Sequence, residues 1–180
     1  MLNIYWLPQK AAPSVTINGF MCMRMNIKEI KLFVMDVDGT LTDGKIYITD
    51  DGEFMKAFHV KDGYGIQKLK ENNIIPIVIT GRQSEIVNRR CKELGIAELY
   101  QGIYDKKETM ENILQKYQLT FKNAVYVGDD ENDLECMQMC GVSACPADAI
   151  PAVQQVVTYR SAYKGGEGAV RDIIEWILNT

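Results

Sequence analysis

Two carboxylates, Asp36 and Asp38, follow a short apolar run that covers residues 32–35. The run is too short for a typical helix, so we predict a buried strand that ends at Asp36 and leads into a turn at the rim of a sheet. Gly39 can adopt the tight turn without steric strain. Two acids at such a rim need a cation beside them. The alternative at this point is a strand followed by a solvated acidic turn.

Polar residues also follow three further predicted strands. They are Thr80, Gly81 and Arg82 after a strand over about 74–79, Lys106 after a strand near 99–100, and Asp129 and Asp130 after a strand over about 124–127. Because the carboxyl ends of parallel strands line one crevice, we expect these side chains to converge. Taken singly, Thr80 could be a helix cap, Lys106 a surface lysine, and the two acids an acidic turn. Agreement at four strand ends favours a shared site.

The chemistry that this set indicates is phosphoryl transfer with Mg²⁺. Magnesium prefers hard oxygen ligands and takes them from carboxylates, water and substrate phosphate. We predict Asp36, Asp38 and Asp129 as the residues that hold the metal. Asp133 follows Asp129 by one helical turn and could orient the metal-bound waters or the predicted active-site lysine. Asp130 could play the same supporting part.

Four residues of the set also have predicted roles in the reaction. Asp36 is the predicted nucleophile, because a carboxylate is ionised at neutral pH and can attack phosphorus without a base. Asp38 is the predicted general acid for the departing alkoxide and then the base for the water that hydrolyses the aspartyl-phosphate. Thr80 and Lys106 are predicted to hold the phosphoryl oxygens and to offset their charge.

The elements that must position these residues alternate between strand and helix from residue 27 onward. After the four strands above, a short strand near 142–144 is expected, and helices are expected over about 62–72, 84–94, 107–117, 131–139 and 170–178. This rhythm predicts an α/β fold with a Rossmann-like parallel sheet and helices on both faces. We expect residues 27–180 to form one domain, and residues 1–26 to form a mobile extension without a steady hydrophobic period.

A β-hairpin is predicted as an insert over about 44–59, with β-rich arms on either side of an Asp-Gly turn. Ile46, Ile48, Phe54 and Phe58 give its arms more apolar surface than an isolated ribbon can bury. The hairpin could fold onto its own domain or pack against other subunits. We expect His59, the single histidine of the chain, to be a packing or hairpin residue rather than a catalyst.

Composition limits the classes of partner. The 24 acidic and 20 basic residues of this 180-residue chain give a net charge of -4, so no basic surface is expected to bind nucleic acid or a membrane. The five cysteines, Cys22, Cys91, Cys136, Cys140 and Cys145, are odd in number and form no Cys-x-x-Cys motif. Reduced thiols in a cytoplasmic protein fit this pattern best, although Cys136 and Cys140 share a predicted helical face.

The motifs together resemble a known family. Asp36-Val37-Asp38-Gly39-Thr40, Thr80, Lys106 and Gly128-Asp129-Asp130-x-x-Asp133 resemble the four signature motifs of the haloacid dehalogenase superfamily, in its phosphatase branch. Further matches resemble the 3-deoxy-D-manno-octulosonate 8-phosphate phosphatases: Thr42-Asp43-Gly44, Lys61-Asp62-Gly63, Thr80-Gly81-Arg82, Gln101-Gly102 and Gly165-Gly166-Glu167-Gly168-Ala169. The resemblance spans nearly everything from Ile30 onward.

The resemblance implies an Mg²⁺-dependent phosphomonoesterase that releases phosphate from a phosphorylated keto-acid sugar. It also implies that the cap domain is absent, that the hairpin builds a homotetramer, and that a neighbouring subunit closes the active site. Independently, the segment between Asp38 and Thr80 is too short for a cap with its own core. A non-catalytic tetramerisation module of a sugar-nucleotide pathway is the alternative. A site that has lost its activity would be expected to lack at least one of five residues that are all present here: Asp36, Asp38, Thr80, Lys106 and Asp129.

The choice of substrate depends on Arg82. By resemblance, Arg after Thr-Gly favours the eight-carbon acid, whereas a phosphatase for a nine-carbon keto-acid sugar 9-phosphate is expected to carry Glu there. An arginine can bind the carboxylate of such a sugar through paired hydrogen bonds. Arg82 could instead pair with a surface acid. Lys61, Arg90 and Arg171 could likewise contact the acid group of the substrate or be ordinary solvated charges.

Overall fold

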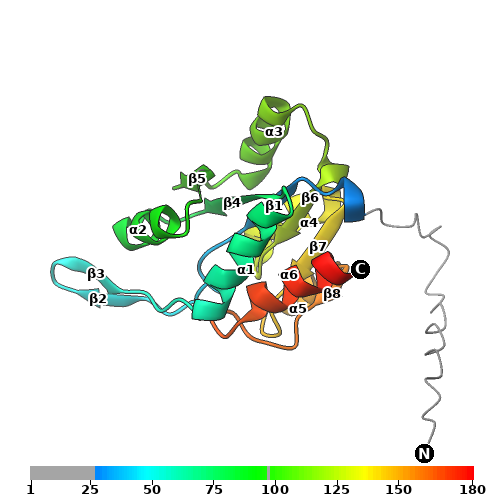
Figure 1. Cartoon of the computed structure of the whole chain (residues 1–180). Coiled ribbons are helices and arrows are strands. Elements are labelled where there is room, and N and C mark those ends of the chain that lie inside the picture. The colour runs from blue at the N-terminus through cyan, green and yellow to red at the C-terminus, as the bar shows by residue number, and fades with distance from the viewer. Residues whose placement is uncertain (1–26, 97) are drawn as a thin grey trace, which may run out of the picture.

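The computed structural model describes residues 27–96 and 98–180, and its main feature is a six-stranded sheet in which every pair of neighbours is parallel (Figure 1). The strand order is β5-β4-β1-β6-β7-β8. The strands are β1 (Leu32–Met35), β4 (Ile75–Thr80), β5 (Glu98–Gln101), β6 (Ala124–Val127), β7 (Val142–Cys145) and β8 (Tyr159–Arg160). The predicted extension over residues 1–26 lies outside the described residues.

Helices cover both faces of the sheet, as the alternating pattern predicted. Along β1, Phe33 and Met35 face one side, and Leu32 and Val34 face the other. The first side packs against α1 (Val60–Glu71), α2 (Glu85–Glu93) and α6 (Ala169–Asn179). The second packs against α3 (Lys106–Tyr117), α4 (Leu134–Met139) and α5 (Pro151–Gln154). Because both faces are covered, β1 is apolar along its whole length.

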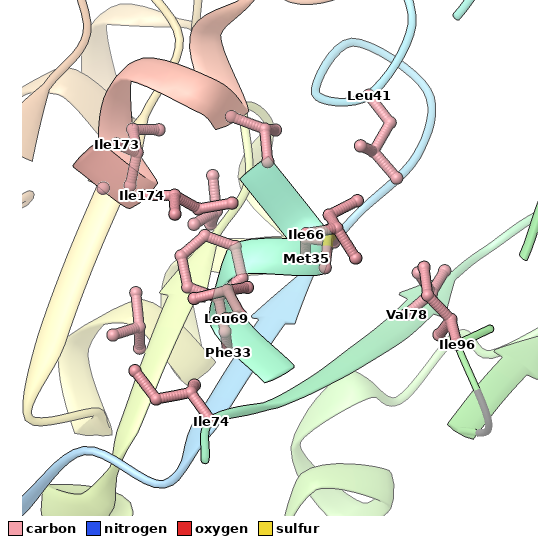
Figure 2. Packing of buried hydrophobic residues seen from close by; sticks show 14 of the residues in the cluster. Phe33, Met35, Leu41, Ile66, Leu69, Ile74, Val78, Ile96, Ile173 and Ile174 are labelled. Carbon is pink, nitrogen blue, oxygen red and sulfur yellow. The ribbon is translucent and has the colours of Figure 1, made fainter. Parts of the chain in front are cut away.

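The core on the first face packs side chains of α1 and α6 against β1. Figure 2 shows Ile66 and Leu69 of α1 in one cluster with the β1 residue Phe33 and the α6 residues Ile173 and Ile174. All five side chains are fully buried. A fully buried aliphatic side chain contributes about 1.5–3 kcal/mol, so this layer fixes the position of β1 and of the residues that follow it.

Three local predictions differ from the structure. The helix predicted over about 131–139 is split into a 3₁₀ turn (Glu131–Asp133) and α4, with Asp130 as the N-cap of the turn. The helix α5 and the strand β8, which are four and two residues long, were not predicted, because elements this short carry no periodic signal. Two more 3₁₀ turns cover Ile27–Glu29 and Phe121–Asn123.

The predicted hairpin consists of β2 (Tyr47–Thr49) and β3 (Gly52–Met55), which form a separate antiparallel sheet that projects from the domain (Figure 1). Its paired strands are shorter than the predicted insert over about 44–59. Ile48 and Phe54 are 71% and 67% exposed, so the described domain does not cover the hairpin strands. Phe58, in contrast, packs against the core.

Between Asp38 and Thr80 the described chain holds this hairpin and α1, and no second domain. The expected absence of a cap therefore holds for the described residues. Among those same residues, no helix combines the length and the apolar character needed to cross a bilayer.

Candidate active site

The turn after β1 presents the two predicted catalytic acids. The backbone N–H of Asp36 donates to the Val127 carbonyl of β6 at 3.0 Å. The N–H groups of Thr40, Leu41 and Thr42 converge on the Val37 carbonyl at 3.2, 2.9 and 3.0 Å. This compact turn holds Asp36 and Asp38 at the carboxyl end of the central strand.

Gly39 lets the turn approach the next strand end. Its φ of +90° lies in the region that favours glycine. A Cβ atom at this position would lie 2.0 Å from Oδ2 of Asp129. Only glycine therefore allows the turn after β1 and the Asp129 carboxylate to come this close. The hydroxyl of Thr40 donates to Oδ1 of Asp129 at 2.8 Å and fixes the orientation of that carboxylate.

Asp36, Asp129 and Asp133 form an acidic cluster, in which one carboxylate oxygen from each lies within 4.8 Å of the others. Burial, with the charge of Asp133 adding to it, raises the pKa of Asp36 to about 6. Burial also raises the pKa of Asp129 to about 7, with further contributions from the charges of Asp36 and Asp133. A divalent cation would remove this repulsion, and oxygen donors are those that magnesium prefers. The cluster therefore fits the predicted metal.

Lys106 joins the cluster from the first residue of α3. Its ammonium lies 2.9 Å from Oδ2 of Asp36 and 2.7 Å from Oδ1 of Asp133, and its side chain is 1% exposed. Burial alone would lower the pKa of Lys106, but the charges of Asp133 and Asp36 outweigh it and raise the pKa. The lysine therefore stays charged beside the predicted nucleophile.

Asp133 is saturated with hydrogen bonds. Besides Lys106, its Oδ1 accepts from the Tyr126 hydroxyl at 3.0 Å, and its Oδ2 accepts from the N–H groups of Asp129 and Asp130 at 3.1 and 3.4 Å. A carboxylate with this many partners is better placed to hold its neighbours than to supply a free ligand atom. Asp133 thus occupies the position from which the predicted orienting role could be performed.

Thr80, Gly81 and Arg82 lie at the end of β4. Thr80 is buried, and its carbonyl accepts from the N–H of Ile103 at 3.1 Å, which joins this strand end to the segment that precedes α3. Arg82 is half exposed, and its Nε lies 3.8 Å from Oδ2 of Asp38. The acid beside Arg82 is thus one of the predicted catalytic pair.

Asp38 has partners outside the acidic cluster. Its Oδ1 accepts a short hydrogen bond from the ammonium of Lys56, and Asp38 is not a member of the group that could hold a metal. Its assignment as a metal ligand stays a prediction. Lys56 was not predicted as a site residue, because a lysine at the end of a hairpin arm is ordinarily solvent-facing. Tyr126 was not predicted either, because its position in a buried strand favours a packing role.

Three cations considered for substrate binding have partners within this chain or lie on its surface. Arg90 pairs with Glu93 at 2.9 Å, and Arg171 pairs with Glu175. Lys61 is exposed on α1.

His59 is the N-cap residue of α1, and its Nδ1 is buried without a hydrogen-bond partner in the described part of the chain. The packing or hairpin role expected for His59 stays a prediction.

Comparisons with known proteins point to one family. Residues 92–174 match the model of the haloacid dehalogenase-like hydrolases. The 3-deoxy-D-manno-octulosonate 8-phosphate phosphatase KdsC of Salmonella typhi is 42% identical over 151 residues, which cover 84% of this chain and 80% of that protein. The KdsC protein of Escherichia coli strain K12 is 41% identical over the same shares.

Solved structures agree with these relatives. A crystal structure of the Moraxella catarrhalis phosphatase, in complex with magnesium, phosphate and KDO, superposes with a TM-score of 0.82 at 41% identity and covers 85% of this chain and 88% of that one. The cobalt-bound Haemophilus influenzae phosphatase gives a TM-score of 0.82 at 37% identity, with 85% and 90% covered. The chain belongs to the 3-deoxy-D-manno-octulosonate 8-phosphate phosphatase family, within the haloacid dehalogenase-like hydrolases.

Proposed function

We propose that this protein is an Mg²⁺-dependent phosphomonoesterase that hydrolyses 3-deoxy-D-manno-octulosonate 8-phosphate to the free sugar acid and phosphate. The observation that carries the proposal is the convergence of Asp36 and Asp129 from the ends of two neighbouring strands, together with the buried ammonium of Lys106 that lies 2.9 Å from Asp36. Two carboxylates and a lysine at one rim can together receive a phosphoryl group and its charge.

Asp36 is the proposed nucleophile. Its pKa of about 6 leaves most of the carboxylate ionised at pH 7 and above. One of its oxygens forms a bond to phosphorus while the bond between phosphorus and the sugar oxygen breaks. Asp38 gives its proton to that oxygen, and the sugar acid leaves. Asp38 then takes a proton from the water that attacks phosphorus, which releases phosphate and restores Asp36.

The remaining residues support these two acids. Lys106 and Thr80 are proposed to hold the phosphoryl oxygens, since the lysine is charged and 2.9 Å from Asp36. Asp36, Asp38 and Asp129 are the proposed residues that hold Mg²⁺, with Asp133 and Asp130 in support. The bound ion supplies positive charge that offsets the carboxylates and the substrate phosphate. Gly81 and Arg82 are proposed to line the path of the substrate.

The eight-carbon substrate is favoured over a nine-carbon keto-acid sugar 9-phosphate. The relatives that are 41–42% identical carry the name of the eight-carbon phosphatase, and the Moraxella catarrhalis structure holds KDO. Arg82 at the mouth of the site could bind the carboxylate of the sugar acid. The alternative of a non-catalytic module is disfavoured, because Asp36, Lys106 and Asp129 are all present and in contact with the site.

We further propose a cytoplasmic homotetramer that is assembled through the hairpin. Ile48 and Phe54 are exposed on the projecting strands, and large exposed apolar side chains commonly mark a contact with another subunit. The cysteines that the structure describes, Cys91, Cys136, Cys140 and Cys145, are free thiols, which suits a reducing compartment.

Phosphate release should be measured with a panel of eight-carbon and nine-carbon keto-acid sugar phosphates, with small hexose phosphates as controls. We expect the highest kcat/KM for 3-deoxy-D-manno-octulosonate 8-phosphate, with activity that EDTA abolishes and Mg²⁺ restores. A clear preference for hexose phosphates would contradict the substrate assignment. Metal-independent activity would contradict the role of the acidic cluster.

A further inference from the structure

Lys56 connects the hairpin to Asp38 from within the same chain. It follows β3 directly, and its side chain is 1% exposed although Phe54 and Met55 before it are 67% and 43% exposed. Its ammonium donates a short hydrogen bond to Oδ1 of Asp38. A lysine is rarely this buried without a charged partner, so the position of Lys56 depends on the acids around it.

A second acid and its partners hold Lys56 in place. Oε1 of Glu53 lies 3.1 Å from the Lys56 ammonium, and the other Glu53 oxygen accepts from the hydroxyl of Ser84. Ser84 is the N-cap of α2, where its hydroxyl accepts from the N–H of Val87 at 3.2 Å and its own N–H donates to Gln101 at 2.8 Å. The hairpin is therefore connected to the β4–α2 segment and to β5 through Glu53 and Ser84.

The proposed chemistry needs Asp38 in one orientation. To act as general acid, its carboxyl group must point at the bond between phosphorus and the sugar oxygen. Asp38 lies on the turn after β1 and is 20% exposed. Lys56 holds one of its oxygens and leaves Oδ2 on the side of Arg82, which is 3.8 Å away on the open rim. One oxygen is thus fixed and the other is available for proton transfer.

We propose that Lys56 is a positioning residue that holds the carboxyl group of Asp38 for proton transfer, and that Glu53 holds Lys56. The inference rests on the proposed function and extends it, because it gives the hairpin a part in the chemistry of its own subunit. Lys56 acts through Asp38 and does not touch the substrate, because its side chain is buried behind that carboxyl group.

The leaving group distinguishes this role from a general structural one. In the first step, the bond from Asp36 to phosphorus forms, the bond from phosphorus to the sugar oxygen breaks, and the proton of Asp38 moves to that oxygen. With 4-nitrophenyl phosphate the departing phenolate is stable without a proton, so the same step needs no acid. The kcat/KM value reports this step, and general acid catalysis contributes about 10²- to 10⁴-fold.

The test compares Lys56→Met with Lys45→Met, a change at an exposed lysine that lies just before β2 and pairs with Asp43. We expect Lys56→Met to lower kcat/KM for the sugar phosphate by about 10- to 100-fold, since a misplaced group costs up to about 10²-fold. For 4-nitrophenyl phosphate we expect a change of less than about threefold. Lys45→Met should leave both values unchanged.

A binding measurement excludes direct contact with the substrate. In an Asp36→Asn background, which should bind the sugar phosphate without turning it over, adding Lys56→Met should leave the Kd for the sugar phosphate unchanged. If Lys56→Met does not fold, Glu53→Gln is the second variant. This variant retains an oxygen for Ser84 and weakens the hold on Lys56, so we expect a smaller loss that is again confined to the sugar phosphate.

Equal losses on both substrates, no loss on either, or weakened binding in the Asp36→Asn background would overturn the proposal for Lys56. Failure of the proposed function itself gives a different result, because the unmodified enzyme would then release no phosphate from the sugar phosphate with Mg²⁺.

Discussion

The acidic cluster and the β2–β3 hairpin differ in what they bury: the cluster buries charged side chains, and the hairpin exposes apolar ones. Asp36 and Asp133 are buried, and both contact the buried ammonium of Lys106. The hairpin strands instead expose Ile48 and Phe54 to solvent. The charged groups of the cluster are therefore paired within one subunit, whereas the apolar groups of the hairpin have no cover in the described part of the chain.

This difference separates chemistry from assembly. A buried charge must be paired inside its own fold, because an unpaired one costs several kcal/mol. An exposed apolar side chain destabilises the subunit little, and a larger exposed apolar patch commonly marks a contact with another subunit. We therefore expect changes in the cluster to affect catalysis and subunit stability, and changes in the hairpin strands to affect association.

The largest effect is expected at the proposed nucleophile. Asp36→Asn should lower kcat for the sugar phosphate by at least about 10⁴-fold, because no other group takes over its bond to phosphorus. The variant should not unfold more easily, because burial and the charge of Asp133, which raise the pKa of Asp36 to about 6, already disfavour the ionised carboxylate in the folded state. Steady-state kinetics and thermal unfolding test both parts. Full activity in this variant would contradict the assignment of Asp36 as the nucleophile.

The next effect concerns the pairing within the cluster. Lys106→Met leaves the buried carboxylates of Asp36 and Asp133 without their cation, and breaking such a buried pair costs about 3–5 kcal/mol. Lys107→Met is the matched control, because the neighbouring lysine forms an exposed pair with Glu135. Urea unfolding without added metal measures the difference. Equal stability of the two variants would show that the buried pair does not hold the cluster.

The hairpin is tested by association. Ile48→Ser combined with Phe54→Ser should raise the dissociation constant of the assembly by about 100-fold or more, because two large apolar side chains lose their contacts. The melting temperature of the dissociated subunit should stay the same. Light scattering after gel filtration gives the mass, and Val156→Ser, at an exposed apolar residue outside the hairpin, is the control. An unchanged mass would place the interface elsewhere.

The smallest effect is the pH dependence of stability without metal. Burial raises the pKa of Asp129 to about 7 and that of Asp36 to about 6, so between pH 5 and pH 8 the folded state binds more protons than the unfolded chain. The stability from these groups is complete below their ordinary pKa of 3.8 and is lost as pH rises through about 7.

The free energy of unfolding in EDTA should therefore fall from pH 5 to pH 8, by on the order of 2 kcal/mol. Saturating Mg²⁺ should reduce the fall, because it binds the ionised carboxylates. Urea titrations at several pH values measure the trend, and Asp129→Asn should flatten it. Stability that instead rises over this range would contradict the raised pKa values.

Much of the fold could be predicted because its signals are periodic. The buried strands are continuous apolar runs, and polar residues such as Thr80 and Asp129 mark where they end. Because parallel strands share one carboxyl edge, these residues were predicted to converge, and the structure brings Asp36, Asp129 and Lys106 together. The bounds of the hairpin strands were predicted less well. The strands are shorter than the predicted insert, because their pairing depends on contacts that carry no periodic signal.

Lys56 shows most clearly what sequence reasoning could not find. It lies eighteen positions after Asp38, on an arm whose neighbours are largely exposed, and its burial depends on how the hairpin returns to the domain. Tyr126 is similar, since only the fold shows that its hydroxyl meets Asp133. Side chains that position a catalytic group follow no fixed spacing in the sequence, because the fold alone decides which of them contact that group.

The most direct test of the account is the chemical identity of the group that carries the phosphoryl intermediate. The sugar phosphate, with labelled phosphorus, should be mixed with excess enzyme and Mg²⁺, quenched in acid within one turnover, and digested for mass spectrometry. We predict that the label is found on the peptide that contains Asp36, and that it is absent in Asp36→Asn. Label on another residue, or turnover by the unmodified enzyme without any labelled peptide, would contradict the central claim.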